Sequence, residues 1–136
     1  MNKSIVIFVF VIMAVSKIGF SQTPTEPWTT AQLIEPEKLA AILNDSTAPQ
    51  PLIINMRPVN SIKGANKIGP AKEKENLNEL KKLLSKENKN RAIVIYCGCC
   101  PFKDCPNIRP AFSLLTKMKF INHKLLNLPK NLKVDW

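Results

Sequence analysis

The sequence predicts an α/β fold with a mostly parallel central sheet and helices on both faces. Two continuous apolar runs, PLIIN at residues 51 to 55 and AIVIY at residues 92 to 96, are typical of strands that are covered on both sides. The residues between them repeat leucine at helical spacing, with charged residues on the other side of the expected helix. Strand, helix and strand in this order indicate parallel pairing through a right-handed crossover.

The remaining elements follow from the same kind of pattern. A first helix is expected to start around residues 35 to 37 and to end at residues 44 to 45, because proline suits a first helical turn and apolar residues then recur at helical spacing. The leucine-rich helix lies between residues 72 and 91. Another helix is expected after residue 107, and KLLNLP at residues 124 to 129 predicts a last short strand.

The first 21 residues have the pattern of a secretory signal peptide. Lys3 precedes an uncharged stretch over residues 5 to 15, and Gly19-Phe20-Ser21 is a small-x-small sequence suited to signal peptidase. The uncharged stretch is about half of the roughly 20 residues that a bilayer requires. We therefore expect an exported protein, periplasmic or secreted, with an uncleaved N-terminal membrane anchor as the alternative.

The rest of the chain is predicted to form one domain. Residues 22 to 32 are rich in proline and threonine and indicate an extended leader, and residues 33 to 136 are long enough for one core. Without the signal peptide the net charge falls from +10 to +8, and the basic residues are scattered among acidic ones. This distribution lacks the aromatic-basic stripe of nucleic-acid binders and favours small anions as partners. We expect a monomer without stable membrane insertion after signal cleavage.

All four cysteines lie within nine positions, directly after the run AIVIY. Disulfides between such close positions would remove little chain entropy, so these thiols are more useful for chemistry than for bracing. In parallel sheets, ligands bind at the carboxyl ends of strands, where this loop lies. A helix N-terminus just after Cys105, the cation Arg109 and a flexible Gly98 all favour a thiolate in the loop.

The sequence resembles the rhodanese-like family over residues 33 to 136. The resemblance is carried by the strand-end cysteine of VIYC, the arginine of IRPAF, and the upstream segment INMRPVNSIKGANKIGPA at residues 54 to 71. It implies a central parallel sheet of about five strands, and a cysteine that accepts a sulfane sulfur as a persulfide and passes it to a thiol acceptor. The implied donor is a small sulfur-containing anion, and no cofactor is implied.

The resemblance assigns roles to individual residues. It places the sulfur carrier at Cys97 and an anion-binding role at Arg109. Arg109 lies twelve positions after Cys97 but only four after Cys105, so Cys105 is the rival carrier. The residues expected to contact substrate or resolve the persulfide are Gly98, Cys99, Cys100 and Arg57.

Three other functions remain open from the sequence. The C-x-x-C spacing from Cys97 to Cys100 also suits a thiol-disulfide redox protein. Four thiolates could instead bind Zn²⁺ or Cu⁺, although the adjacent Cys99 and Cys100 make tetrahedral ligation awkward, so no metal ligand is assigned. A catalytically silent binding module is the last alternative. Of the other residues, His123 is expected to be exposed in a loop, and Trp28 and Trp136 to pack or anchor a terminus.

Overall fold

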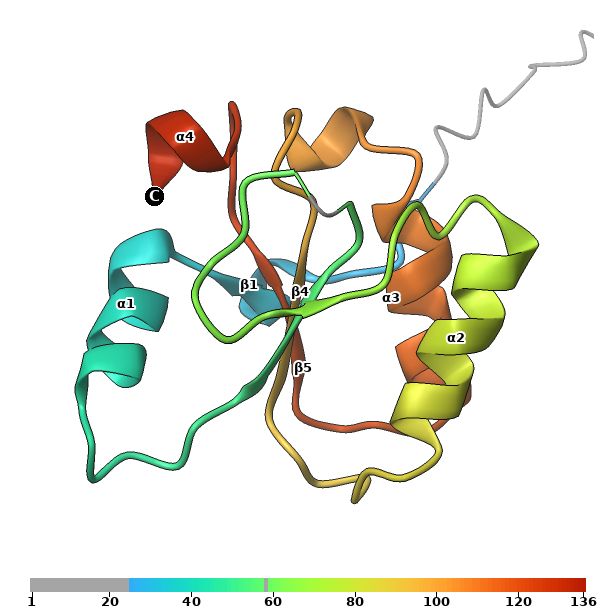
Figure 1. The fold of residues 1–136 in the computed structure, drawn as a ribbon, viewed down its shortest axis with the longest axis horizontal. Coiled ribbons are helices and arrows are strands. Elements are labelled where there is room, and N and C mark those ends of the chain that lie inside the picture. Colours follow the sequence, from blue (N-terminus) through green and yellow to red (C-terminus); the bar gives the residue numbers. More distant parts are fainter. Residues whose placement is uncertain (1–24, 58) are drawn as a thin grey trace, which may run out of the picture.

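The computed structural model describes residues 25–57 and 59–136, and these residues form an α/β fold around a five-stranded parallel sheet (Figure 1). The strand order is β1-β5-β4-β2-β3, and every pairing is parallel. The strands are β1 (Leu33–Ile34), β2 (Leu52–Asn55), β3 (Asn66–Lys67), β4 (Ile93–Tyr96) and β5 (His123–Leu126). The predicted α/β class with a parallel central sheet of about five strands is therefore confirmed.

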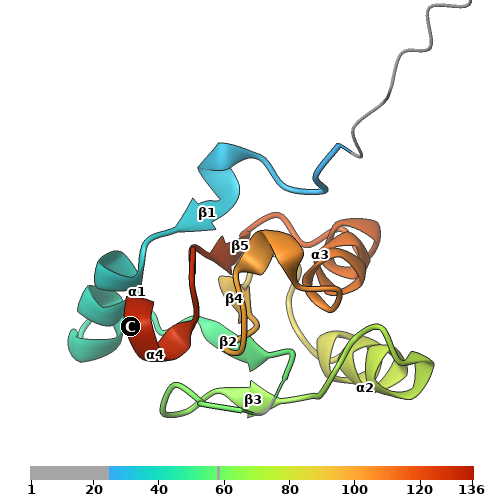
Figure 2. The same ribbon diagram turned by 90° about the horizontal axis from the view of Figure 1, so that it is seen from above.

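Helices cover both faces of the sheet, as Figure 2 shows from above. One face carries α1 (Pro36–Asn44) and the short α4 (Leu132–Asp135), and the other carries α2 (Lys74–Leu84) and α3 (Ile108–Lys117). Each face has its own apolar core. Alternate residues of β4 serve the two cores, since Ile93 and Ile95 pack on the side of α2 and α3 while Val94 and Tyr96 pack on the side of α1.

The two continuous apolar runs form adjacent central strands, as the sequence predicts. Residues of β2 and β4 pair directly, from Leu52 with Ile93 to Asn55 with Tyr96, and all eight are buried. The last strand begins at His123 and ends at Leu126, three residues before the predicted end. The strands β1 and β3 have two residues each, too few for a detectable sequence pattern.

The predicted leader is part of the folded domain and is not simply extended. Residues Thr30–Gln32 form a 3₁₀ turn, η1. Trp28 is buried and packs against Phe102 and Phe112, with ring centroids 5.9 and 5.7 Å apart. The prediction that Trp28 packs is confirmed, whereas Trp136 is 45% exposed.

His123 is buried at the start of β5, so the expectation of an exposed loop histidine is wrong. Its Nδ1 donates to the carbonyl of Phe120 at 2.9 Å, which leaves Nε2 to accept from the side-chain amide of Gln32 at 3.4 Å. The hydroxyl of Thr116 also lies 3.2 Å from Nε2. The ring also packs on Phe112, with centroids 4.5 Å apart. The histidine thus ties β5 to α3 and to the N-terminal segment.

Residues 1 to 24, which include the predicted signal peptide, lie outside the described part of the chain. Within the described residues, no helix is both long enough and apolar enough to cross a membrane. Export remains a prediction from the sequence.

Candidate functional site: a cluster of four thiols

The cysteine loop connects the carboxyl end of β4 to the start of α3. Cys97 follows the last residue of β4, the 3₁₀ turn η2 (Phe102–Asp104) bridges the middle, and Cys105 lies three residues before α3. Figure 1 shows η2 and α4 at the same end of the sheet. The thiols therefore occupy the edge of the parallel sheet where α/β proteins place ligands.

The structure brings all four thiols together as free cysteines. The Sγ atoms of Cys97 and Cys99 are 3.3 Å apart, and those of Cys99 and Cys100 are 3.2 Å apart. Cys105 lies close enough to Cys97 and Cys100 for both thiols to influence its pKa. Cys97 and Cys105 are buried, whereas Cys99 and Cys100 are partly exposed, so the cluster meets solvent on the side of the last two.

Backbone contacts hold the loop in place on both sides. The amide of Phe102 donates to the carbonyl of Leu128 at 3.1 Å, and the amide of Leu132 donates to the carbonyl of Gly98 at 3.1 Å. A Cβ atom on Gly98 would lie 2.9 Å from the carbonyl oxygen of Val59 and 3.0 Å from that of Asn60. Close backbone packing therefore requires glycine at position 98. The sequence predicts Gly98 only as a substrate contact, and this prediction does not include the structural role.

Cys105 is the thiol whose surroundings best stabilise an anion. A hydrogen bond from the Cys97 thiol, followed by contacts from the amides of Asn107 and Ile108 and from Cys100, lowers the pKa of Cys105 to about 6 against the opposing effect of burial. The two amides belong to the N-terminal end of α3, where the helix dipole also favours a negative charge.

The other two perturbed thiols are held in the neutral form. The hydrogen bond to Cys105, together with burial, raises the pKa of Cys97 well above its ordinary value. Burial and the hydrogen bond to Cys99 raise the pKa of Cys100 to about 12. Within this pair the pKa of Cys97 is raised and that of Cys105 is lowered, a direction that favours Cys105 as the thiol that becomes the anion.

Arg57 is the guanidinium group that reaches a thiol. It lies just after β2, and its Nη1 donates to the Sγ of Cys99 at 3.4 Å. The same contact raises the pKa of Arg57 above its ordinary value. The side chain is exposed, so a cation lies beside the solvent-facing part of the cluster.

Arg109 is turned away from the thiols, which corrects the predicted placement at the anion. Its Nη2 donates to Glu26 at 2.6 Å and to the carbonyl of Lys103 at 2.7 Å. The guanidinium also lies 5.6 Å from the centroid of the Trp28 ring. Its observed contacts thus tie the N-terminal segment to α3. Nothing in the local sequence around Arg109 indicates a partner 83 residues away.

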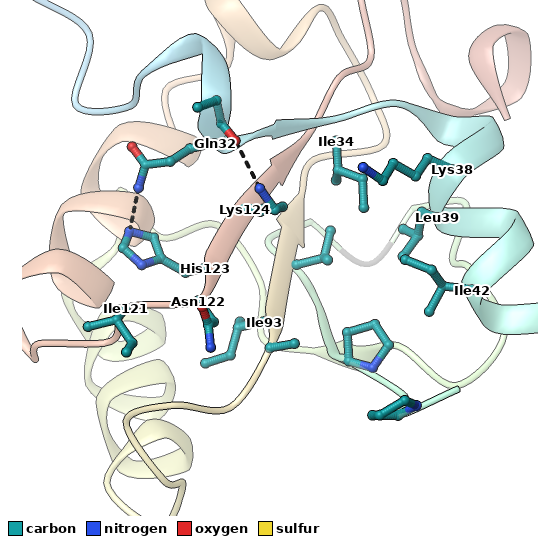
Figure 3. Close-up of a pocket in the computed structure, with 15 residues that line it drawn as sticks. Gln32, Ile34, Lys38, Leu39, Ile42, Ile93, Ile121, Asn122, His123 and Lys124 are labelled. Atoms are coloured by element: carbon teal, nitrogen blue, oxygen red, sulfur yellow. Dashed lines mark hydrogen bonds between the residues drawn. The ribbon is translucent and has the colours of Figure 1, made fainter. Parts of the chain in front are cut away.

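A largely apolar hollow lies at the other end of the sheet. It has a volume of about 440 Å³ and is bounded by α1, β1, the first residues of β4 and the start of β5 (Figure 3). Lys124 lies at its wall but is engaged with the carbonyl of Ala31 at 2.8 Å. The hollow contains none of the thiols, so it is separate from the cysteine site.

Comparison of the chain with protein-family models, curated proteins and solved structures found no match. The class of protein that the fold and site define is an α/β domain with a thiol cluster at the carboxyl edge of its parallel sheet.

Proposed function

We propose that this protein is a sulfurtransferase or sulfur-relay protein that carries sulfane sulfur as a cysteine persulfide. The observation that supports the proposal most directly is the position of Cys105 three residues before α3, at the carboxyl end of the parallel sheet, where the first amides of the helix lower the pKa of its thiol. This is the arrangement in which a sulfur anion is stabilised without a metal or an organic cofactor.

The chemistry needs a thiolate and an anionic donor. The Cys105 thiolate attacks the outer sulfur of a donor such as thiosulfate, an S–S bond forms to the protein, and sulfite leaves with the electron pair of the broken bond. The charge balances, because one thiolate and a dianion become a persulfide anion and the sulfite dianion. The amides that stabilise the thiolate then also stabilise the persulfide anion.

Access to Cys105 is expected from the side of Cys99 and Cys100, since Cys105 itself is buried. The exposed cation of Arg57 beside Cys99 favours an anionic donor on that side. The resemblance to the rhodanese-like family supports persulfide chemistry, with Arg57 in place of Arg109 as the residue near the donor.

Release of the sulfur is proposed to use a neighbouring thiol. The Cys97 thiol gives its proton to the outer sulfur of the Cys105 persulfide anion, and the Cys97 thiolate attacks the inner sulfur. A Cys97–Cys105 disulfide forms, and hydrosulfide leaves with the electron pair of the broken S–S bond. An external thiol acceptor that attacks the outer sulfur instead takes the sulfane sulfur and returns Cys105 as the thiolate.

The proposal is tested by intact-mass measurement of the reduced protein before and after exposure to thiosulfate. We expect an adduct of about +32 Da, one sulfur atom, on Cys105. Cys105→Ser should lose the adduct and cyanide-dependent thiocyanate production, whereas Cys97→Ser keeps a hydrogen-bond donor to Cys105 and should keep both. Absence of the adduct in the unmodified sequence, or its retention in Cys105→Ser, would contradict the proposal.

Thiol-disulfide exchange is the second candidate, and the 3.3 Å separation of the Cys97 and Cys99 sulfurs favours it. Oxidation of this pair would release two electrons and two protons to a disulfide or quinone acceptor. Titration of the thiols against glutathione buffers distinguishes the two functions. A redox protein forms one disulfide reversibly in these buffers and gains no sulfur from thiosulfate.

A further inference from the structure

We propose that Cys97, Cys99 and Cys100 form a three-coordinate site for a cuprous ion. This inference does not rest on the proposed sulfur transfer, because it concerns the three thiols whose sulfur atoms lie together and needs no sulfur donor. The carrier proposed above, Cys105, is not one of the three ligands.

The three sulfur atoms are already close enough to share one ion. All three lie within 4.8 Å of one another, with two of the separations at 3.2 and 3.3 Å. Metal–sulfur bonds of about 2.3 Å place the sulfurs of a trigonal site about 4.0 Å apart. Small side-chain rotations of the partly exposed Cys99 and Cys100 would therefore suffice to reach ligation geometry.

The number of ligands favours copper over zinc. Structural Zn²⁺ sites are almost always tetrahedral and need four ligands. Cys105 is not in the group of three sulfurs that lie within 4.8 Å of one another. Soft thiolate ligands select Cu⁺, which accepts three of them.

The surroundings supply charge compensation and access. Three thiolates and one Cu⁺ carry a net charge of −2, and the Arg57 guanidinium is 3.4 Å from the Cys99 sulfur. Each thiol that ligates loses its proton to solvent, so no oxidation or reduction occurs on binding. Cys97 is buried while the other two ligands are partly exposed, so the ion would enter from solvent and rest against the end of β4.

The test is anaerobic titration of the fully reduced protein with Cu⁺ in competition with the chelator bicinchoninate. We expect transfer of one Cu⁺ per chain and three sulfur neighbours in the copper X-ray absorption spectrum. Cys99→Ser and Cys100→Ser should each weaken binding at least about tenfold, because each variant loses one of the three thiolate ligands and keeps only two. Both residues are partly exposed, so these variants should fold, which far-ultraviolet circular dichroism checks.

Cys105→Ser is the matched control and should still bind one Cu⁺ with an affinity within about threefold of the unchanged sequence. The proposal is overturned if Cys105→Ser weakens binding as much as Cys99→Ser does, or if the protein transfers no copper from the chelator. It is also overturned if Zn²⁺ binds with four sulfur neighbours. Loss of sulfur transfer with normal copper binding would count against the proposed function alone.

Discussion

Arg57 lies beside the solvent-facing sulfur of Cys99, and its position after β2 is set by local backbone contacts. The amide of Arg57 donates to the side-chain oxygen of Asn55 at 3.0 Å, and the amide of Met56 donates to the backbone carbonyl of Tyr96 at 2.8 Å. The residue is therefore held at the edge of the cluster while its guanidinium reaches across to the cysteine loop.

Replacing Arg57 should affect anionic donors selectively. We expect Arg57→Gln to slow persulfide formation from thiosulfate by about three- to tenfold, because the cation no longer attracts the dianion. The rate with an uncharged organic persulfide donor should change little. Arg91→Gln, which removes a cation paired with Glu87 at 3.2 Å, is the matched control. Equal slowing with both donors would show that Arg57 acts through the loop conformation and not through its charge.

Gly98 has a packing requirement that a substitution would violate. Gly98→Ala should lower the free energy of unfolding by about 1 to 3 kcal/mol, because the added Cβ would meet backbone oxygen atoms that cannot move independently. Urea denaturation followed by circular dichroism measures the change. Asp104→Ala, an exposed position in the same loop, should change stability by less than about 0.5 kcal/mol. A similar effect in both variants would contradict this role of Gly98.

Among the elements, the N-terminal segment and α3 depend on each other. The segment that ends in η1 carries Glu26 and Trp28, and both contact Arg109 of α3. The amide of Thr29 donates to the side-chain oxygen of Gln32, and the side-chain amide of Gln32 also reaches His123. These contacts join residues more than 80 positions apart. They explain why a proline- and threonine-rich stretch with the composition of a leader is part of the domain.

Truncation of Trp28 tests this dependence. Trp28→Ala should lower the free energy of unfolding by about 3 to 5 kcal/mol, because a buried aromatic ring between Phe102 and Phe112 is lost. Trp136→Ala removes the other tryptophan, which is 45% exposed, and should cost less than about 1 kcal/mol. Chemical denaturation of both variants gives the comparison. Equal costs would mean that the N-terminal segment is not part of the cooperative unit.

At the scale of the whole molecule, stability should depend on the protonation of a single histidine. Burial lowers the pKa of His123 below its ordinary value of 6.5, against the opposing effect of the hydrogen bond to Phe120. The unfolded chain therefore binds a proton more readily than the folded one below about pH 6.5. This contribution to stability is fully present above that pH and is lost progressively as the pH falls toward the folded-state pKa.

The pH dependence can be isolated because the chain contains one histidine. We expect the free energy of unfolding, measured in urea, to decrease between about pH 6.5 and pH 5 in the unchanged sequence. His123→Gln should flatten this slope even if it lowers stability at every pH. If the free energy of unfolding of His123→Gln decreased with falling pH as steeply as that of the unchanged sequence, the pH dependence would come from the carboxylates and not from His123.

The sequence by itself determined the fold class, the two central strands and the location of the thiols at a strand end. These features can be predicted from the sequence because strands buried on both faces appear as continuous apolar runs, and helices appear as apolar residues at helical spacing. Tertiary structure alone decided which arginine faces the thiols and that His123 is buried. Arg57 meets Cys99 across 42 positions of the chain, and Arg109 meets Glu26 across 83 positions. A pattern of neighbouring residues does not indicate contacts between residues so far apart in the sequence.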